Sequence, residues 1–125
     1  MANSTHGIGR LVRAVGFSLQ GLRAAWRHEA AFREEVLLSL VLFPCAFWLG
    51  HDAADYAILL SSLLIFLITE LLNSAVEALT DRVGTELHEL SGRAKDLGSA
   101  AVFLAFLLLV LVWSMYAWQR LGIAG

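Results

Sequence analysis

Five polar side chains interrupt one long apolar run of the chain: Glu70, Asn73, Ser74, Glu77 and Asp81. At 100° per residue, all five fall on one stripe of a helix. A charged side chain near the centre of a bilayer costs at least about 2.5–3.5 kcal/mol. Residues 56–79 contain no Lys, Arg or His that would neutralise Glu70. The stripe therefore predicts a functional site, and its alternative is a hydrogen-bonding seam that specifies how helices pack in an oligomer.

The spacing of the glutamates predicts different tasks for them. Glu70 and Glu77 lie about 10.5 Å apart along a helix axis, which is too far for them to bind one ion together. The deeper Glu70 lies in a low-dielectric setting, where a carboxylate is a stronger base. The shallower Glu77 lies near the water interface, where a divalent cation could arrive with a nucleotide. Glu29 is available as a second acid, whereas a solvated helix face is the simpler explanation for Glu34 and Glu35.

Long apolar helices must position these acids. The chain has 125 residues, of which 58% are hydrophobic and 16% charged, and its mean hydropathy is +0.69. Soluble domains carry about 45–50% apolar and about 25% charged residues. Three stretches, at about 36–51, 56–79 and 97–119, approach the roughly 20 residues that cross a bilayer. The sequence predicts an all-α membrane protein with three transmembrane helices in a single domain, residues 1–125.

Residues 1–35 are expected to form an amphipathic helix that lies in the headgroup region. Apolar residues recur there at helical spacing, with arginines on the opposite flank. A plain membrane anchor and a substrate-contacting element both fit this pattern. Eight of the nine Lys and Arg residues fall before the first span or between the second and third. The positive-inside rule therefore predicts a cytoplasmic N-terminus and a multi-pass protein of the cytoplasmic membrane.

Several other functions are excluded or only weakly indicated. A net charge of −2 leaves no electrostatic footprint for nucleic acid, and Cys45 has no partner for a disulfide framework. His88 and Glu89 do not begin a zinc motif, because the second histidine of H-E-x-x-H is missing. Residues 92–99 combine glycines with two cations. This segment either holds a phosphate or serves as a topology signal, and it matches no phosphate-binding motif.

The polar stripe ELLNSAVEALTD (70–81) resembles the signature of the prokaryotic integral-membrane diacylglycerol kinases. The segments GLRAAW (21–26), EAAFR (29–33), HELSGRAKD (88–96) and GSAAV (98–102) are also similar to that family. The resemblance covers effectively the whole chain. It implies a homotrimeric enzyme of the bacterial inner membrane that transfers the γ-phosphate of MgATP to diacylglycerol, giving phosphatidic acid. An undecaprenol kinase is the alternative enzyme, and a small transporter subunit is the alternative outside the enzymes.

The resemblance also implies residue roles. Glu70 would be the general base on the lipid hydroxyl, supported by Asn73, and Glu29 and Glu77 would hold Mg²⁺. The residues implied in ATP binding are Arg10, Phe17, Glu29, Glu77, Glu86, His88, Lys95 and Asp96. Those implied in binding or supporting the lipid are Arg10, Ala14, Arg23, Trp26, Ala31, Glu35, Trp48, Asn73, Ser99 and Trp113. Phe17 and Leu87 depart from the family pattern, which often has tyrosine there.

A site shared between protomers is expected on physical grounds. One protomer with three spans and a surface helix has too little wall to enclose both a lipid and a nucleotide. Close packing of helices requires small side chains where they meet. Such residues are present on the second predicted span: Ser61, Ser62, Ser74, Ala75 and Ala78.

Overall fold

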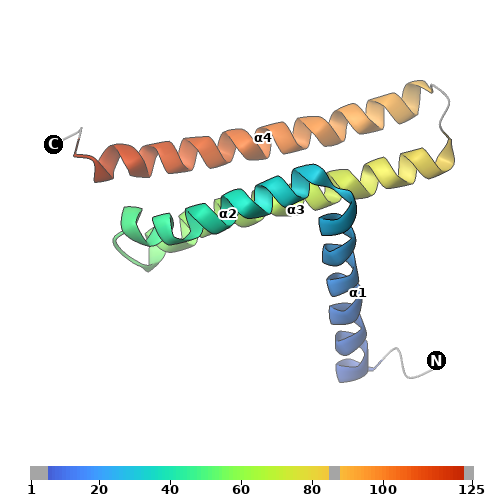
Figure 1. Ribbon diagram of the computed structural model, residues 1–125, viewed down its shortest axis with the longest axis horizontal. Helices are drawn as coiled ribbons and strands as arrows, with labels where there is room; N and C mark the ends of the chain where they lie inside the picture. Colours follow the sequence, from blue (N-terminus) through green and yellow to red (C-terminus); the bar gives the residue numbers. More distant parts are fainter. Residues whose placement is uncertain (1–5, 85–87, 123–125) are drawn as a thin grey trace.

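The computed structural model describes residues 6–84 and 88–122, and all its regular structure is helical (Figure 1). Its helices are α1 (Gly7–His28), α2 (Ala30–Leu49), α3 (Ala53–Val83) and α4 (Glu89–Arg120). Helices α2, α3 and α4 lie side by side, whereas α1 projects away from them (Figure 1). The predicted all-α class is confirmed for the described residues.

The packing between α3 and α4 is the most extensive in the chain. Leu63 and Phe66 of α3 pack against Ala105 and Leu109 of α4. A second cluster joins α2 to α3 through Ala46, Leu49 and Leu59. Because lipid tails are as apolar as leucine, such contacts stabilise a membrane bundle through van der Waals packing rather than through exclusion from water. Alanines at the crossings let the helix backbones approach.

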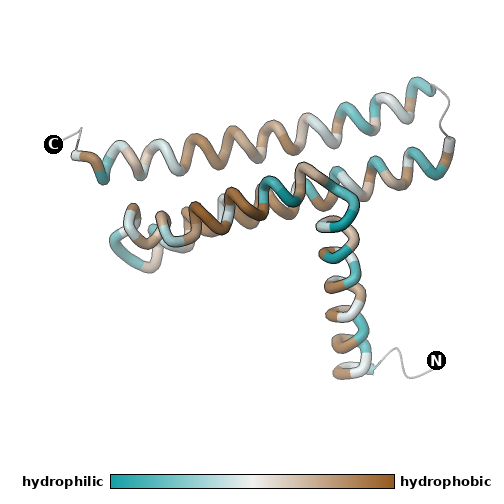
Figure 2. The backbone as a smooth tube through the Cα atoms, in the orientation of Figure 1, coloured by the Kyte–Doolittle hydropathy of each residue, from teal (hydrophilic) through white to brown (hydrophobic). Residues whose placement is uncertain are grey.

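Two helices are long and apolar enough to cross a membrane, α3 with 31 residues and α4 with 32. Only 11% of the most apolar window of α4 is buried, whereas the core helix of a soluble protein would be mostly covered. Figure 2 shows apolar central parts in both helices and hydrophilic residues toward their connection. Two of the three predicted spans are therefore supported. The crossing of α2 stays a prediction, because three charged residues occupy its first two turns: Arg33, Glu34 and Glu35.

Helices α3 and α4 both continue past their apolar runs. The predicted spans, 56–79 and 97–119, lie inside helices that cover 53–83 and 89–120. Residues 92–99 are consequently helical. Their backbone N–H groups are bonded within the helix, so any contact of this segment with a phosphate would come from side chains such as Lys95.

The expected surface helix ends earlier than residue 35. Helix α1 stops at His28, Glu29 has the extended angles φ −117° and ψ 105°, and α2 begins at Ala30. Ala25 and Phe32, on the two sides of this break, are buried at 6% and 5% exposure. The chain has to change direction here, because α1 projects from the bundle and α2 runs along it (Figure 1). Residues 30–35 thereby become the start of α2.

Candidate active site

Glu70 is the one buried charged residue among those the structure describes, with 5% of its surface exposed. It lies within the apolar part of α3. Ser74, one helical turn further on, donates a long hydrogen bond of 3.5 Å to the Glu70 Oε2 atom. Asn73 and Glu77 are half-buried and Asp81 is exposed. The stripe of polar residues therefore runs from the interior of the bundle to solvent.

Glu35 of α2 faces Glu70 across the helix interface, close enough for their carboxyl groups to interact. The Glu35 Oε1 atom is buried and has no hydrogen-bond partner among the described residues. Glu34 is exposed. The solvated-face explanation thus holds for Glu34 and is wrong for Glu35. Phe32, three residues before Glu35 and therefore on the same helix face, is a large apolar residue in the sequence that could have indicated a buried Glu35. The structure buries it.

Asn73 lies directly against Gly98 of α4. A Cβ atom on Gly98 would overlap the Asn73 Oδ1 atom and approach its Cγ atom to 3.3 Å. The same Oδ1 atom is buried without a hydrogen-bond partner among the described residues. Gly98 therefore makes room for the amide between α3 and α4, a packing role that the glycine pattern of 92–99 did not predict.

Unpaired polar atoms gather around Glu70. Leaving a buried donor or acceptor unsatisfied costs about 1–3 kcal/mol, and native proteins rarely do so without a functional reason. Glu35, whose Oε1 atom is unpaired, faces Glu70 from α2, and the unpaired Asn73 oxygen lies against Gly98, one helical turn beyond Glu70 on α3. This arrangement is capable of accepting a proton and hydrogen bonds from a ligand hydroxyl.

The exposed end of the polar stripe carries a cation. The Lys95 Nζ atom forms an ion pair of 2.6 Å with the Asp81 Oδ1 atom, which joins α4 to α3 beyond their apolar runs. The hydrogen bond to Asp81, together with the charges of Asp81 and Glu77, raises the pKa of Lys95 above its ordinary value. Lys95 therefore stays protonated and is suited to an anionic group such as a phosphate.

The two predicted metal ligands lie on different helices. Glu29 lines a groove of about 690 Å³ between α1 and α3, which Ser74 also lines. Glu77 is half-buried on α3. No group of three or more His, Cys, Asp or Glu residues in the described ranges is arranged to hold a metal ion. Carboxylate oxygens nevertheless suit Mg²⁺, which is commonly bound through one or two carboxylates, waters and substrate phosphates.

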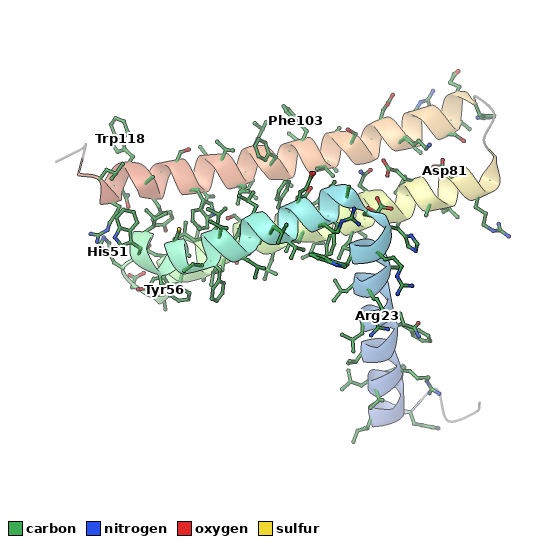
Figure 3. The ribbon with its side chains drawn as sticks, in the orientation of Figure 1. Arg23, His51, Tyr56, Asp81, Phe103 and Trp118 are labelled. Carbon is green, nitrogen blue, oxygen red and sulfur yellow. The ribbon has the colours of Figure 1, made fainter. Side chains whose placement is uncertain are left out.

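The remaining predicted residues are distributed over several elements. Figure 3 shows Arg23 on α1 and Asp81 toward the connection between α3 and α4. The His88 Nδ1 atom accepts a hydrogen bond of 3.0 Å from the Leu90 N–H, so this side chain caps α4. Glu86 and Leu87 lie outside the described residues. Exposed positions are occupied by Arg10, Ala14, Phe17, Arg23, Trp26, Ala31, Asp96 and Ser99.

Trp48 and Trp113 lie far from Glu70. Trp48 is about 20 Å along α2 from Glu35, and the Arg120 guanidinium lies 4.9 Å from its ring centre. Trp113 donates a hydrogen bond of 3.0 Å to the Ser62 hydroxyl. Within one chain, the structure does not bring these two tryptophans to the buried carboxyl groups, and their contact with the lipid stays a prediction.

Comparison with known proteins identifies the family. A model of the family "Prokaryotic diacylglycerol kinase" matches residues 16–117. A diacylglycerol kinase of Escherichia coli (strain K12) is 50% identical over 122 residues, which is 98% of this chain and 100% of that relative. The diacylglycerol kinase of Haemophilus influenzae is 49% identical over 109 residues, covering 87% of this chain and 92% of the relative. That of Pseudomonas aeruginosa is 49% identical over 108 residues, covering 86% and 88%.

The matched residues include the polar stripe, the break between α1 and α2 at Glu29, and the Lys95–Asp81 ion pair. It covers more than half of the chain, and the relatives extend it over nearly the whole length. The chain therefore belongs to the prokaryotic diacylglycerol kinase family.

Proposed function

We propose that this protein is a lipid kinase that transfers the γ-phosphate of ATP to the hydroxyl of diacylglycerol, giving phosphatidic acid and ADP. The observation that carries the proposal is the buried Glu70 carboxyl, which faces Glu35 across the interface between α2 and α3. The relatives that cover the whole chain bear the name diacylglycerol kinase. The single chain is thus expected to supply a base for the lipid and a cationic edge for the nucleotide.

In the proposed mechanism, the Glu70 carboxylate removes the proton from the acceptor hydroxyl while the hydroxyl oxygen forms its bond to the γ-phosphorus. The bond to the β,γ-bridging oxygen breaks, and ADP leaves. Such transfers depend mainly on positioning and on stabilisation of charge. Asn73 and Ser74 orient the base, and Lys95 attracts the nucleotide phosphates. Mg²⁺, when bound, supplies charge neutralisation, and Glu29 and Glu77 are the residues that would hold it.

We further propose a homotrimer in the bacterial inner membrane, with three spans per chain and a cytoplasmic N-terminus. Eight of nine Lys and Arg residues support this orientation. Support for a shared site comes from Glu29 and Glu77, which lie on different elements and do not complete a metal-binding group among the described residues of one chain. The small residues Ser74, Ala75 and Ala78 line the groove beside α1, where another protomer could approach closely.

The first test is a phosphorylation assay in mixed micelles with dioleoylglycerol, labelled ATP and varied Mg²⁺. We expect Mg²⁺-dependent formation of phosphatidic acid, which Glu70→Gln lowers by about 10²–10⁴ and the exposed control Glu34→Gln leaves unchanged. Turnover of undecaprenol in place of diacylglycerol would retain the mechanism and change the substrate. Inactivity with both lipids, together with ion flux in liposomes, would contradict the kinase and favour a transporter subunit.

A further inference from the structure

Arg33 of α2 reaches back to the end of α1. Its Nη1 atom donates hydrogen bonds of 2.7 Å to the Trp26 carbonyl and 3.2 Å to the Arg27 carbonyl. The last carbonyls of a helix have no helical partner, and a cation at that end also interacts favourably with the helix dipole. Arg33 therefore caps α1 from the neighbouring helix.

Arg33 spans the bend between α1 and α2, which consists of a single residue, Glu29, and is called the elbow below. The Glu29 N–H donates to the Ala25 carbonyl at 2.9 Å, and the Arg33 N–H donates to the Glu29 carbonyl at 3.2 Å. Glu29 is thus both the C-cap residue of α1 and the N-cap residue of α2. Its own side chain makes no capping hydrogen bond, so the carboxylate is free for a ligand.

Little else fixes the direction of α1. Ala25 is its one buried residue, whereas Ile8, Leu11 and Phe17 are 80%, 63% and 66% exposed. Both hydrogen bonds come from the Arg33 Nη1 atom, and they connect two successive carbonyls at the end of α1 to α2. The angle at Glu29 consequently depends on Arg33.

We infer that Arg33 is a positioning residue that fixes the α1–α2 elbow and so holds the Glu29 carboxylate in the groove beside α3. The effect on catalysis rests on the proposed function, in which Glu29 is a ligand of Mg²⁺. From the sequence alone, Arg33 is only one of the positive charges that predict a cytoplasmic N-terminus. The structure gives its guanidinium a specific task at two carbonyl oxygens.

Arg27 provides a matched control. It has the same charge and lies at the same elbow, but its guanidinium makes no hydrogen bond or ion pair within the described residues. Only its backbone carbonyl interacts with Arg33. Arg27→Gln therefore removes an equal charge from the membrane surface without removing the cap. Arg33→Lys keeps the charge and replaces the planar donor with one ammonium.

The kinetic test measures kcat and the Mg²⁺ concentration for half-maximal phosphorylation. We expect Arg33→Gln to raise the Mg²⁺ requirement about tenfold while kcat at saturating Mg²⁺ changes less than about threefold, since groups that orient a metal ligand typically contribute 10–100-fold in affinity. Arg33→Lys should lie between, and Arg27→Gln should match the unsubstituted protein. Equal effects of Arg33→Gln and Arg27→Gln, or a loss of kcat with an unchanged Mg²⁺ requirement, would overturn the inference.

A second readout does not depend on kinase activity. Spin labels at positions 19 and 104, on exposed faces of α1 and α4, report the elbow angle in the full-length protein after Cys45→Ala. Dilution with unlabelled chains keeps the measured distances within one chain. Arg33→Gln should broaden the distance distribution, and Arg33→Lys should broaden it less. An unchanged distribution would overturn the inference, whereas broadening in a protein without kinase activity would retain the elbow and reject the proposed function.

Discussion

Ser62 and Glu70 are the two buried polar residues of α3, and their surroundings differ. The Ser62 hydroxyl donates to the Leu59 carbonyl at 2.6 Å and accepts from the Trp113 Nε1–H at 3.0 Å. Glu70 has one long hydrogen bond, from Ser74. Glu35, which faces Glu70 from α2, and Asn73, one turn further on α3, each carry a buried oxygen without a partner among the described residues.

The same contrast separates the two ends of the bundle. At the end distant from Glu70, Asp55 accepts hydrogen bonds of 2.8 Å from both the Tyr116 hydroxyl and the His51 N–H. Buried polar groups that are fully paired stabilise a fold, whereas unpaired ones occur where a ligand completes them. Polar groups inside the bundle are therefore structural where their hydrogen bonds are satisfied, and they indicate chemistry where they are not.

The largest expected effect comes from Glu70→Gln, which removes the base and keeps the shape of the side chain. Turnover should fall by about 10²–10⁴, the usual contribution of general-base catalysis. Thermal stability in detergent should stay the same or rise, because a buried carboxyl is replaced by an amide that can donate to Glu35. Phosphatidic acid formation and thermal unfolding are the measurements. Normal turnover would exclude Glu70 as the base.

The next largest effect is expected from Gly98→Ala. The added Cβ atom would overlap Asn73, so α4 must shift away or the amide must turn. Overpacking of this kind typically costs about 1–3 kcal/mol. Thermal unfolding should show the loss, and kcat should fall with it. Gly92→Ala is the control, since a Cβ atom there meets nothing within 4 Å. Equal stability of the two variants would contradict this packing.

A smaller and more specific effect is expected from Glu77→Gln. Loss of one carboxylate ligand should raise the Mg²⁺ concentration for half-maximal activity about tenfold, with a smaller change in the KM for lipid. The measurement is a Mg²⁺ titration at saturating diacylglycerol. A titration curve identical to that of the unsubstituted protein would count against a ligand role.

The smallest effect should come from the distant end of the bundle. Tyr116→Phe removes the hydroxyl that donates to Asp55, which should lower thermal stability slightly because one hydrogen bond between α3 and α4 is lost. Activity at a temperature well below unfolding should stay within twofold of the unsubstituted protein. A large loss of activity without a loss of stability would show that this end also takes part in the chemistry.

Much of the fold and part of the candidate site follow from residue order. The polar stripe, the apolar runs and the family resemblance all depend on spacing along the chain, and the comparisons confirm the family. The helical class is likewise confirmed for the described residues, and two of their helices are long and apolar enough to cross a membrane. The roles of Glu29, Glu77 and the nucleotide-contacting residues stay predictions.

The helical segments and the polar stripe follow from the amino-acid sequence, because helical periodicity and hydropathy are local properties. Which polar groups meet depends on the packing of the helices: Glu35 with Glu70, Asn73 with Gly98 and Arg33 with the end of α1. Each of these contacts joins two helices, so it depends on helix rotation and crossing, which follow from packing over the whole bundle. The break at Glu29 was equally hidden, since the angle between α1 and α2 depends on the hydrogen bonds from Arg33 to the end of α1.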